Sequence, residues 1–240
     1  MASPITDIVV TTRNRLDGLR RTLSYIYERT RSPYRLHVLD DASSEGNVDY
    51  LMEEFKAGRV HHLLLHGERV GAMAQLNMGT WMAVSDPIVF VDDDILCPDV
   101  EPDWLARGLR AMDERPRLGL LALNHPNANR RHTHGDGVVT YCLCVGGTFM
   151  FARRNLVENF RLPHFRDNFG VTPTTKRSAI ARKHNYQVGF LADTYCFHTE
   201  EWSSLNESVR SRRREIEDVD PKTLEPLDKR FRGPYGTPKL

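Results

Sequence analysis

Short apolar segments alternate with amphipathic segments along the first half of the chain, and this alternation limits the possible folds more than any other feature. The apolar segments cover residues 7–12, 34–41, 60–66 and 87–94. Between the first two, Leu16, Leu19, Leu23 and Ile26 recur at the spacing of one helix face. Strands that alternate with helices predict a mostly parallel sheet covered on both faces. We therefore predict an α/β fold of the Rossmann-like type, with three α/β/α layers.

The second half of the sequence is less regular. It predicts a helix over residues 103–112, a strand over 118–123 and a polar loop over 124–137. Two short strands around a double glycine follow, and then a helix, a strand and a short extended piece that ends at His198. After residue 202 the sequence becomes polar. We predict one domain over residues 1–202 and a polar C-terminal extension over residues 203–240.

Composition and charge argue against several classes of protein. The formal net charge of +1 gives no global field for nucleic acid or an acidic membrane. The four cysteines show no zinc-ligand spacing, and we expect them to be reduced. We expect Cys142 and Cys144, two positions apart, to point to one face of a strand. The N-terminus lacks the pattern of a signal peptide, and no apolar run reaches the length of a membrane span. We expect a cytoplasmic protein without a transmembrane segment.

The fourth segment ends in three consecutive carboxylates, Asp92, Asp93 and Asp94, directly after its apolar residues. In open α/β sheets, ligands bind at the carboxyl ends of the strands. Thr11 and Asp41 also stand at predicted strand ends, so we expect them at the same edge. Mg²⁺ and Mn²⁺ prefer carboxylate oxygens and are often held by one or two of them together with substrate phosphates. The alternative is a solvated acidic loop.

The motifs, taken in order, resemble those of the GT-A fold glycosyltransferases, in particular the large inverting family-two-like group. The resemblance covers roughly residues 5–198. It rests on "IVVTTRNR", on "VLDDAS", on "ERVGAMAQLNMG", on "VFVDDD" at the Asp-x-Asp position, and on "GGTFMFARRNL" and "ARKHNYQVGFLADTYCFH". The resemblance implies a transferase that moves a sugar from a nucleoside-diphosphate sugar, expected to be of the UDP type, to an acceptor hydroxyl.

The resemblance also implies roles for individual residues. Asp41 would accept a hydrogen bond from the nucleotide base, and Arg69 would lie near the base or the diphosphate. Asp94 would be the direct ligand of Mn²⁺ or Mg²⁺, and His198 would approach the same metal or the diphosphate. The remaining residues expected to bind the nucleotide sugar are Thr11, Arg13, Asp92, Asp93 and Gly147. Each has a structural alternative: a turn cap at Asp41, a strand-end hydroxyl at Thr11, a buried histidine at His198 and a bulge at Gly147.

The catalytic base is the weakest match to the family pattern. The family usually carries a Glu-Asp pair about a dozen residues before a Gly-Tyr dipeptide, which is Asn185-Tyr186 here. Thr174 stands at that distance, and the nearest acid is Asp167. We predict Asp167 as the base that deprotonates the acceptor in an inverting reaction. The alternatives are a loop salt bridge and a retaining reaction.

Two other classes of protein compete with this interpretation. A nucleotidyltransferase would share the sheet and the metal-binding acid, but that class is expected to carry a glycine-rich pattern after the first strand. The segment "TTRNRLDG" at this place lacks the pattern. A non-catalytic module that binds nucleotide sugars is the second alternative. The acceptor stays open among a saccharide, a protein, a small molecule and a hydroxymethylated DNA base. The last option draws on the basic and aromatic residues of the C-terminal extension, for which a solvated helix with i,i+4 ion pairs is the favoured alternative.

Overall fold

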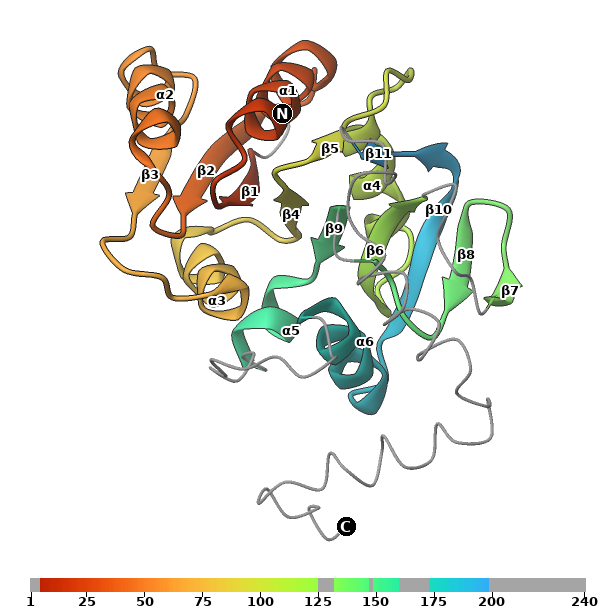
Figure 1. Cartoon of the computed structure of the whole chain (residues 1–240). Helices are drawn as coiled ribbons and strands as arrows, with labels where there is room; N and C mark the ends of the chain where they lie inside the picture. The colour runs from red at the N-terminus through yellow and green to blue at the C-terminus, as the bar shows by residue number, and fades with distance from the viewer. Residues whose placement is uncertain (1–4, 125–131, 147–148, 160–172, 199–240) are drawn as a thin grey trace, which may run out of the picture. The chain divides into compact units, whose positions relative to one another are not determined.

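Nine strands form one central sheet in the computed structural model, which describes residues 5–124, 132–146, 149–159 and 173–198 (Figure 1). The strands lie in the order β3-β2-β1-β4-β9-β6-β10-β8-β7. Within this sheet, β8 and β9 pair antiparallel with their neighbours, and the other strands share one direction. The bounds are β1 Thr6–Thr12, β2 Tyr34–Asp40, β3 His62–Leu65, β4 Ile88–Asp92, β6 Leu118–Asn124, β7 His132–Gly135, β8 Val139–Cys142, β9 Phe149–Ala152 and β10 Gln187–Tyr195.

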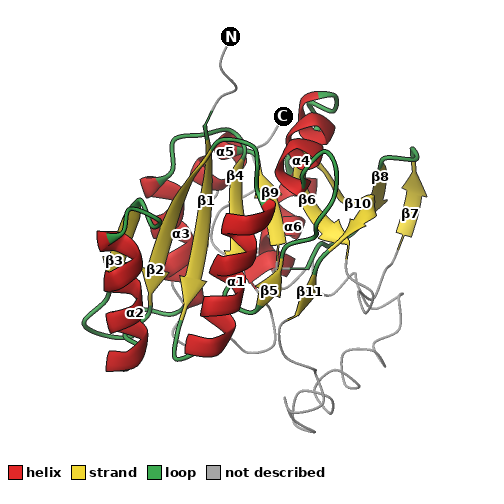
Figure 2. Ribbon diagram, turned by 90° about the horizontal axis from the view of Figure 1, so that it is seen from above, coloured by secondary structure: helices red, strands yellow, loops and turns green. Residues whose placement is uncertain are grey.

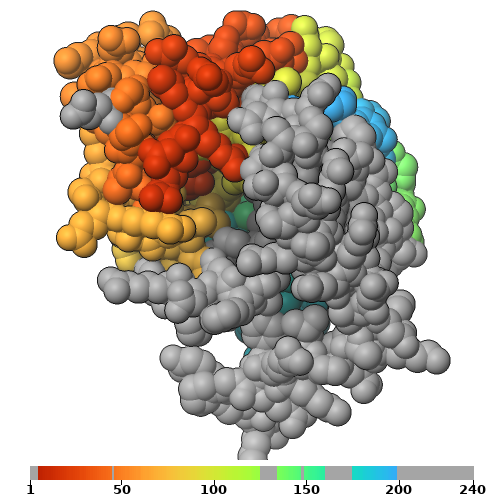
Figure 3. All heavy atoms as spheres, in the orientation of Figure 1, coloured from red at the N-terminus to blue at the C-terminus, as the bar shows by residue number. Residues whose placement is uncertain are grey.

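Helices cover both faces of the sheet, so the predicted three-layer α/β/α arrangement is confirmed (Figure 2). One face packs against α1 (Leu16–Arg29), α2 (Glu45–Lys56) and α4 (Trp104–Asp113). The other face packs against α3 (Ala72–Met82), α5 (Arg154–Asn159) and α6 (Pro173–Lys183). In the space-filling view, the side chains of the N-terminal half (red to yellow) pack into one continuous mass (Figure 3).

Strand β4 shows why this part of the sequence reads as a continuous apolar run. Val89 and Val91 belong to the apolar cluster on one face, while Ile88 and Phe90 belong to the cluster on the other. A strand buried on both faces needs apolar residues at every position. The strand ends where Asp92 reaches the edge of the sheet, so the acids begin where the core stops.

A second, two-stranded sheet lies next to the end of β4. Strand β5 (Ile95–Leu96) pairs antiparallel with β11 (Phe197–His198), with His198 opposite Ile95. The backbone N–H of Ile95 donates to the Thr22 hydroxyl at 3.0 Å, which ties β5 to α1. This small sheet brings His198 to the acids across a long stretch of sequence.

Two predictions about the second half were wrong in part. The predicted polar loop over residues 124–137 contains β7, whose hairpin with β8 is stabilised by Asp136. This carboxylate accepts from the Arg115 guanidinium at 2.8 Å and from the Tyr141 hydroxyl at 3.0 Å. Cys144 lies beyond the end of β8, so it does not share a strand face with Cys142. The predicted boundary between residues 202 and 203 lies outside the described residues.

A buried network closes the edge of the sheet opposite to the acids. Asp7, at the start of β1, accepts hydrogen bonds from Arg35 at 2.7 Å, His37 at 2.8 Å, Val84 N–H at 2.6 Å and Ser85 N–H at 2.8 Å. Burial alone would raise the pKa of Asp7, but the hydrogen bonds outweigh it and hold that pKa far below its ordinary value. The ionised Asp7 therefore stabilises the fold at pH values above the unfolded-state pKa of about 4.

We expect Asp7→Asn to lower the free energy of unfolding by about 3–5 kcal/mol at pH 7, because it removes one partner of a buried ionic network. The wild-type chain should begin to lose this stabilisation as the pH falls below about 4, because Asp7 then binds protons in the unfolded chain and not in the folded one. Urea unfolding between pH 3 and 7 measures both effects. Asp17→Asn, on the exposed side of α1, is the matched control. Equal stability of the two variants at pH 7 would contradict this account.

Candidate active site

The pairing of the parallel strands gathers the candidate residues at one edge of the sheet. Thr11 on β1 lies directly beside Asp92 on β4, and Thr12 lies beside Asp40 on β2. Asp41 follows immediately, and its N–H donates to the Thr12 carbonyl at 3.0 Å. The sequence therefore placed these polar groups at the correct edge, where open α/β sheets bind ligands.

Asp92 is partly buried, and its surroundings disfavour the ionised form of its carboxyl group. Burial, together with the charges of Asp94 and Asp93, raises its pKa to about 8. We find no side-chain hydrogen bond to Asp92 from the described part of the chain. Both features suit a carboxylate that requires a bound cation or a hydrogen-bond donor from a ligand.

Asp93 serves as an anchor for the loop after β1. Its Oδ2 accepts from the Thr12 hydroxyl at 2.7 Å and from the Arg13 N–H at 3.3 Å. Burial raises the pKa of Asp93 to about 6, while the Thr12 hydrogen bond and the charge of Arg15 oppose the rise. These contacts give Asp93 a positioning role that the sequence did not predict.

Asp94 lies between two side chains that come from distant segments. Its Oδ2 forms a short ion pair with Arg15 Nη1, and its Oδ1 lies 3.5 Å from His198 Nδ1. Burial alone would raise the pKa of Asp94, but His198 and Arg15 outweigh it and hold that pKa below its ordinary value. The structure thus brings the two predicted metal ligands, Asp94 and His198, together.

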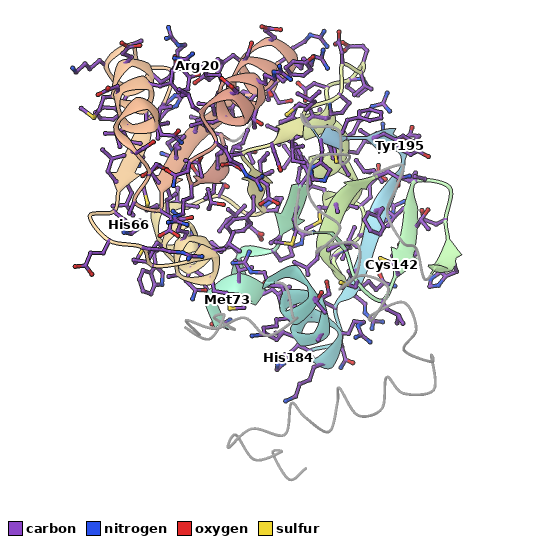
Figure 4. All side chains as sticks on the ribbon, in the orientation of Figure 1. Arg20, His66, Met73, Cys142, His184 and Tyr195 are labelled. Atoms are coloured by element: carbon purple, nitrogen blue, oxygen red, sulfur yellow. The ribbon has the colours of Figure 1, made fainter. Side chains whose placement is uncertain are left out.

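Asp41 holds the loop that leads into α3. Its carboxylate accepts from the N–H groups of Val70 at 2.6 Å and Gly71 at 3.1 Å. His66 and Met73, both labelled in Figure 4, lie just before and just after this loop. Asp41 therefore shapes the wall of the predicted base pocket, and its remaining lone pairs can still accept from a ligand.

The other predicted residues divide into two groups. Arg13 and Arg69 lie on loops at this edge with exposed side chains. Gly147 and Asp167 lie outside the described residues, so their predicted roles stay predictions.

Arg15 is the main site residue that the sequence analysis missed. It stands immediately before α1, at the helix N-terminus, where the peptide dipoles disfavour a cation. That unfavourable position was the available signal, because it requires a nearby negative charge to compensate.

The residues at Asp94 fit a divalent cation that takes part of its coordination from a ligand. Within residues 5–124, 132–146, 149–159 and 173–198, no group of three or more His, Cys, Asp or Glu side chains is placed to hold a metal ion alone. However, adjacent ligands about 2.1 Å from an octahedral Mg²⁺ lie roughly 3 Å apart, so Asp94 Oδ1 and His198 Nδ1, 3.5 Å apart, need to approach by only about 0.5 Å to share one ion. Magnesium sites commonly combine one or two carboxylates with substrate phosphates.

The three-layer fold places clustered carboxylates and a histidine at the edge where open α/β sheets bind ligands. The family model for glycosyl transferase family 2 matches residues 7–185. The chain belongs to this family. No curated protein matches the sequence.

Solved structures of similar fold include three glycosyltransferases. Mannosyltransferase PcManGT from Pyrobaculum calidifontis, in complex with GDP-Man and Mn²⁺, has a TM-score of 0.71 at 20% identity over 88% of this chain and 61% of its own. Residues 1–349 of S. aureus TarS with UDP-GlcNAc give 0.63 at 15% identity, with 82% and 59% covered. GalNAc-T7 with UDP, GalNAc and Mn²⁺ gives 0.63 at 11% identity, with 81% and 43% covered.

These similarities confirm the predicted fold, a mixed α/β fold of the GT-A type. The chain spans 61% or less of the length of these three structures. No helix among the described residues is both long and apolar enough to cross a membrane.

Proposed function

We propose that the chain is a metal-dependent glycosyltransferase that moves a sugar from a nucleoside-diphosphate sugar to an acceptor hydroxyl. The observation that carries the proposal is the convergence of Asp92, Asp94 and His198 on one edge of the sheet. A UDP-type donor, an inverting outcome with Asp167 as base, and a saccharide or a hydroxymethylated DNA base as acceptor are the finer parts of the proposal.

We assign separate proposed tasks to the residues of this edge, which their positions support. Asp94 and His198 would hold Mn²⁺ or Mg²⁺, which as a Lewis acid neutralises the charge that develops on the departing diphosphate. Asp92 would accept from a ribose hydroxyl or a metal-bound water. Thr11 and Asp41 would bound the pocket for the base, with Arg69 reaching the nucleotide from the exposed loop.

A thermal-shift panel tests the proposal. We expect one nucleotide sugar among UDP-glucose, UDP-GlcNAc and GDP-mannose to raise the melting temperature by roughly 5–10 °C when Mn²⁺ is present, as saturation at about 100 times Kd adds about 2.7 kcal/mol. EDTA should abolish the shift. The absence of any shift across the panel, with and without Mn²⁺, would contradict the proposal. A shift without any transfer or hydrolysis of the sugar would instead favour the non-catalytic binding module.

A further inference from the structure

Arg15 places a permanent positive charge directly on the acids of the candidate metal site. Its Nη1 pairs with Asp94 Oδ2 and lies 3.5 Å from Asp93 Oδ1. The Arg15 side chain is 38% exposed, whereas those of Asp93 and Asp94 are 8% and 10% exposed. A guanidinium cannot lose its proton in a protein, so this charge must move rather than titrate if another cation takes its place.

The local backbone does not favour a cation at the position of Arg15. Arg15 occupies the N-cap position of α1, and its side chain makes no capping hydrogen bond. A cation at a helix N-terminus is unfavourable, because the peptide dipoles already place positive charge there. Among the described residues, the ion pairs with Asp93 and Asp94 offset this unfavourable placement of the guanidinium.

The Arg15 side chain can leave without rearranging the loop that carries it. The preceding residue, Asn14, fixes the backbone, because its N–H donates to the Ser43 hydroxyl at 2.8 Å and its Oδ1 accepts from the Ser44 N–H at 2.8 Å. Asp93 is likewise held by contacts that do not involve Arg15, from the Thr12 hydroxyl and the Arg13 N–H.

Asp94 differs from Asp93 in this respect. The side chains that contact its carboxylate are those of Arg15 and His198, one on each oxygen. Departure of Arg15 would expose Asp94 Oδ2 while Oδ1 stays beside His198. The carboxylate that the proposed function needs for the metal is thus the one that Arg15 covers.

We propose that Arg15 is an internal counter-ion that a divalent cation displaces from Asp94, and that the released guanidinium then binds the diphosphate of the nucleotide. The inference rests on the proposed function and adds a positioning residue to it. When the metal binds alone, breaking the ion pair between Arg15 and Asp94 costs free energy. When the nucleotide is also present, the contacts between the released guanidinium and the phosphates offset this cost. Metal and nucleotide therefore bind cooperatively, through a side chain that each of them affects.

The test measures Mn²⁺ binding and nucleotide binding separately, on the full chain. Free Mn²⁺ is titrated by electron paramagnetic resonance against wild type and Arg15→Gln. We expect Arg15→Gln to bind Mn²⁺ alone at least about fivefold more tightly. Calorimetric titration with UDP and with GDP at saturating Mn²⁺ should then show at least about fivefold weaker nucleotide binding by the same variant. A merely structural role would not change the two affinities in opposite directions.

Two further variants complete the design. Arg20→Gln removes an exposed arginine on the same helix, whose guanidinium lies over the Tyr50 ring at 5.0 Å, and it should bind like wild type (Figure 4). Arg15→Lys keeps the charge but cannot span two carboxylates, so its Mn²⁺ affinity should fall between those of wild type and Arg15→Gln. If Arg15→Gln does not fold, Arg15→Lys tests the proposal in its place, and its affinity for Mn²⁺ alone must then exceed that of wild type.

The outcomes separate the two proposals. Equal or weaker Mn²⁺ binding by Arg15→Gln, with wild type binding Mn²⁺ normally, overturns the role of Arg15 and leaves the proposed function standing. Failure of wild type and of every variant to bind Mn²⁺, with and without nucleotide, overturns the metal-dependent function and the role of Arg15 together.

Discussion

An Asp94→Asn variant is expected to transfer sugar about 10²–10³-fold more slowly than wild type, the usual loss when one preorganised group that stabilises transition-state charge is removed. An amide is a far weaker ligand for a hard divalent cation than a carboxylate. The substitution also removes the partner of Arg15, whose guanidinium then pairs with Asp93 alone. Nucleotide release from the nucleotide sugar that gives the largest thermal shift measures the rate.

The control for this prediction is Asp99→Asn, the same substitution five residues further along the chain. Asp99 is exposed and lies 3.5 Å from Arg31, away from the acids. It should retain the wild-type rate. An Asp94→Asn variant with more than about a tenth of the wild-type rate would remove Asp94 from the metal site, because removal of a single charge-stabilising group costs at least about a hundredfold.

Gly108→Ala should be clearly destabilising, although Gly108 lies outside the site. Gly108 lies on α4 against the sheet, and a Cβ added there would lie less than 3.0 Å from three ring carbons of Phe151. Phe151 is fully buried and packs edge-on to Trp104, so its ring has no free direction in which to move. Overpacking of this kind costs about 1–3 kcal/mol, and occasionally more.

Gly46→Ala is the matched control. The added Cβ would meet Leu16 Cδ2 at 3.7 Å, an ordinary contact, and alanine favours the helical conformation of α2. Urea unfolding should therefore place the two variants on opposite sides of wild type. A Gly108→Ala variant as stable as wild type would show that α4 can move away from β9.

The parts of the fold that could be predicted from the sequence depend on local patterns. Helical spacing identified α1, and continuous apolar runs identified β1, β2 and β4, because strands buried on both faces exclude polar residues. The acidic edge followed from the same logic, since parallel strands end together. Asp92 and Thr11 are therefore neighbours as expected.

The remaining features depend on contacts between distant residues or on backbone angles that a pattern does not show. The ion pair of Arg15 with Asp94 joins a helix start to a strand end 79 positions away. Asn185 stands where related sequences usually carry glycine, and its φ of +59° explains the exchange, because asparagine tolerates the left-handed region. The strand β7 could not be predicted, since its four residues, "HTHG", have no apolar periodicity.

The pairing of β5 with β11 also makes the assembly of the acidic edge depend on a contact between distant parts of the chain. His198 reaches Asp94 only after residues about one hundred positions apart have docked, and contacts of such long sequence separation carry the largest loop-closure cost. Strands β1, β2 and β4 can pair without waiting for that event. Cys196, two positions before His198, is fully buried in the hydrophobic core. The acidic edge therefore acquires its histidine only when this end of the hydrophobic interior is packed.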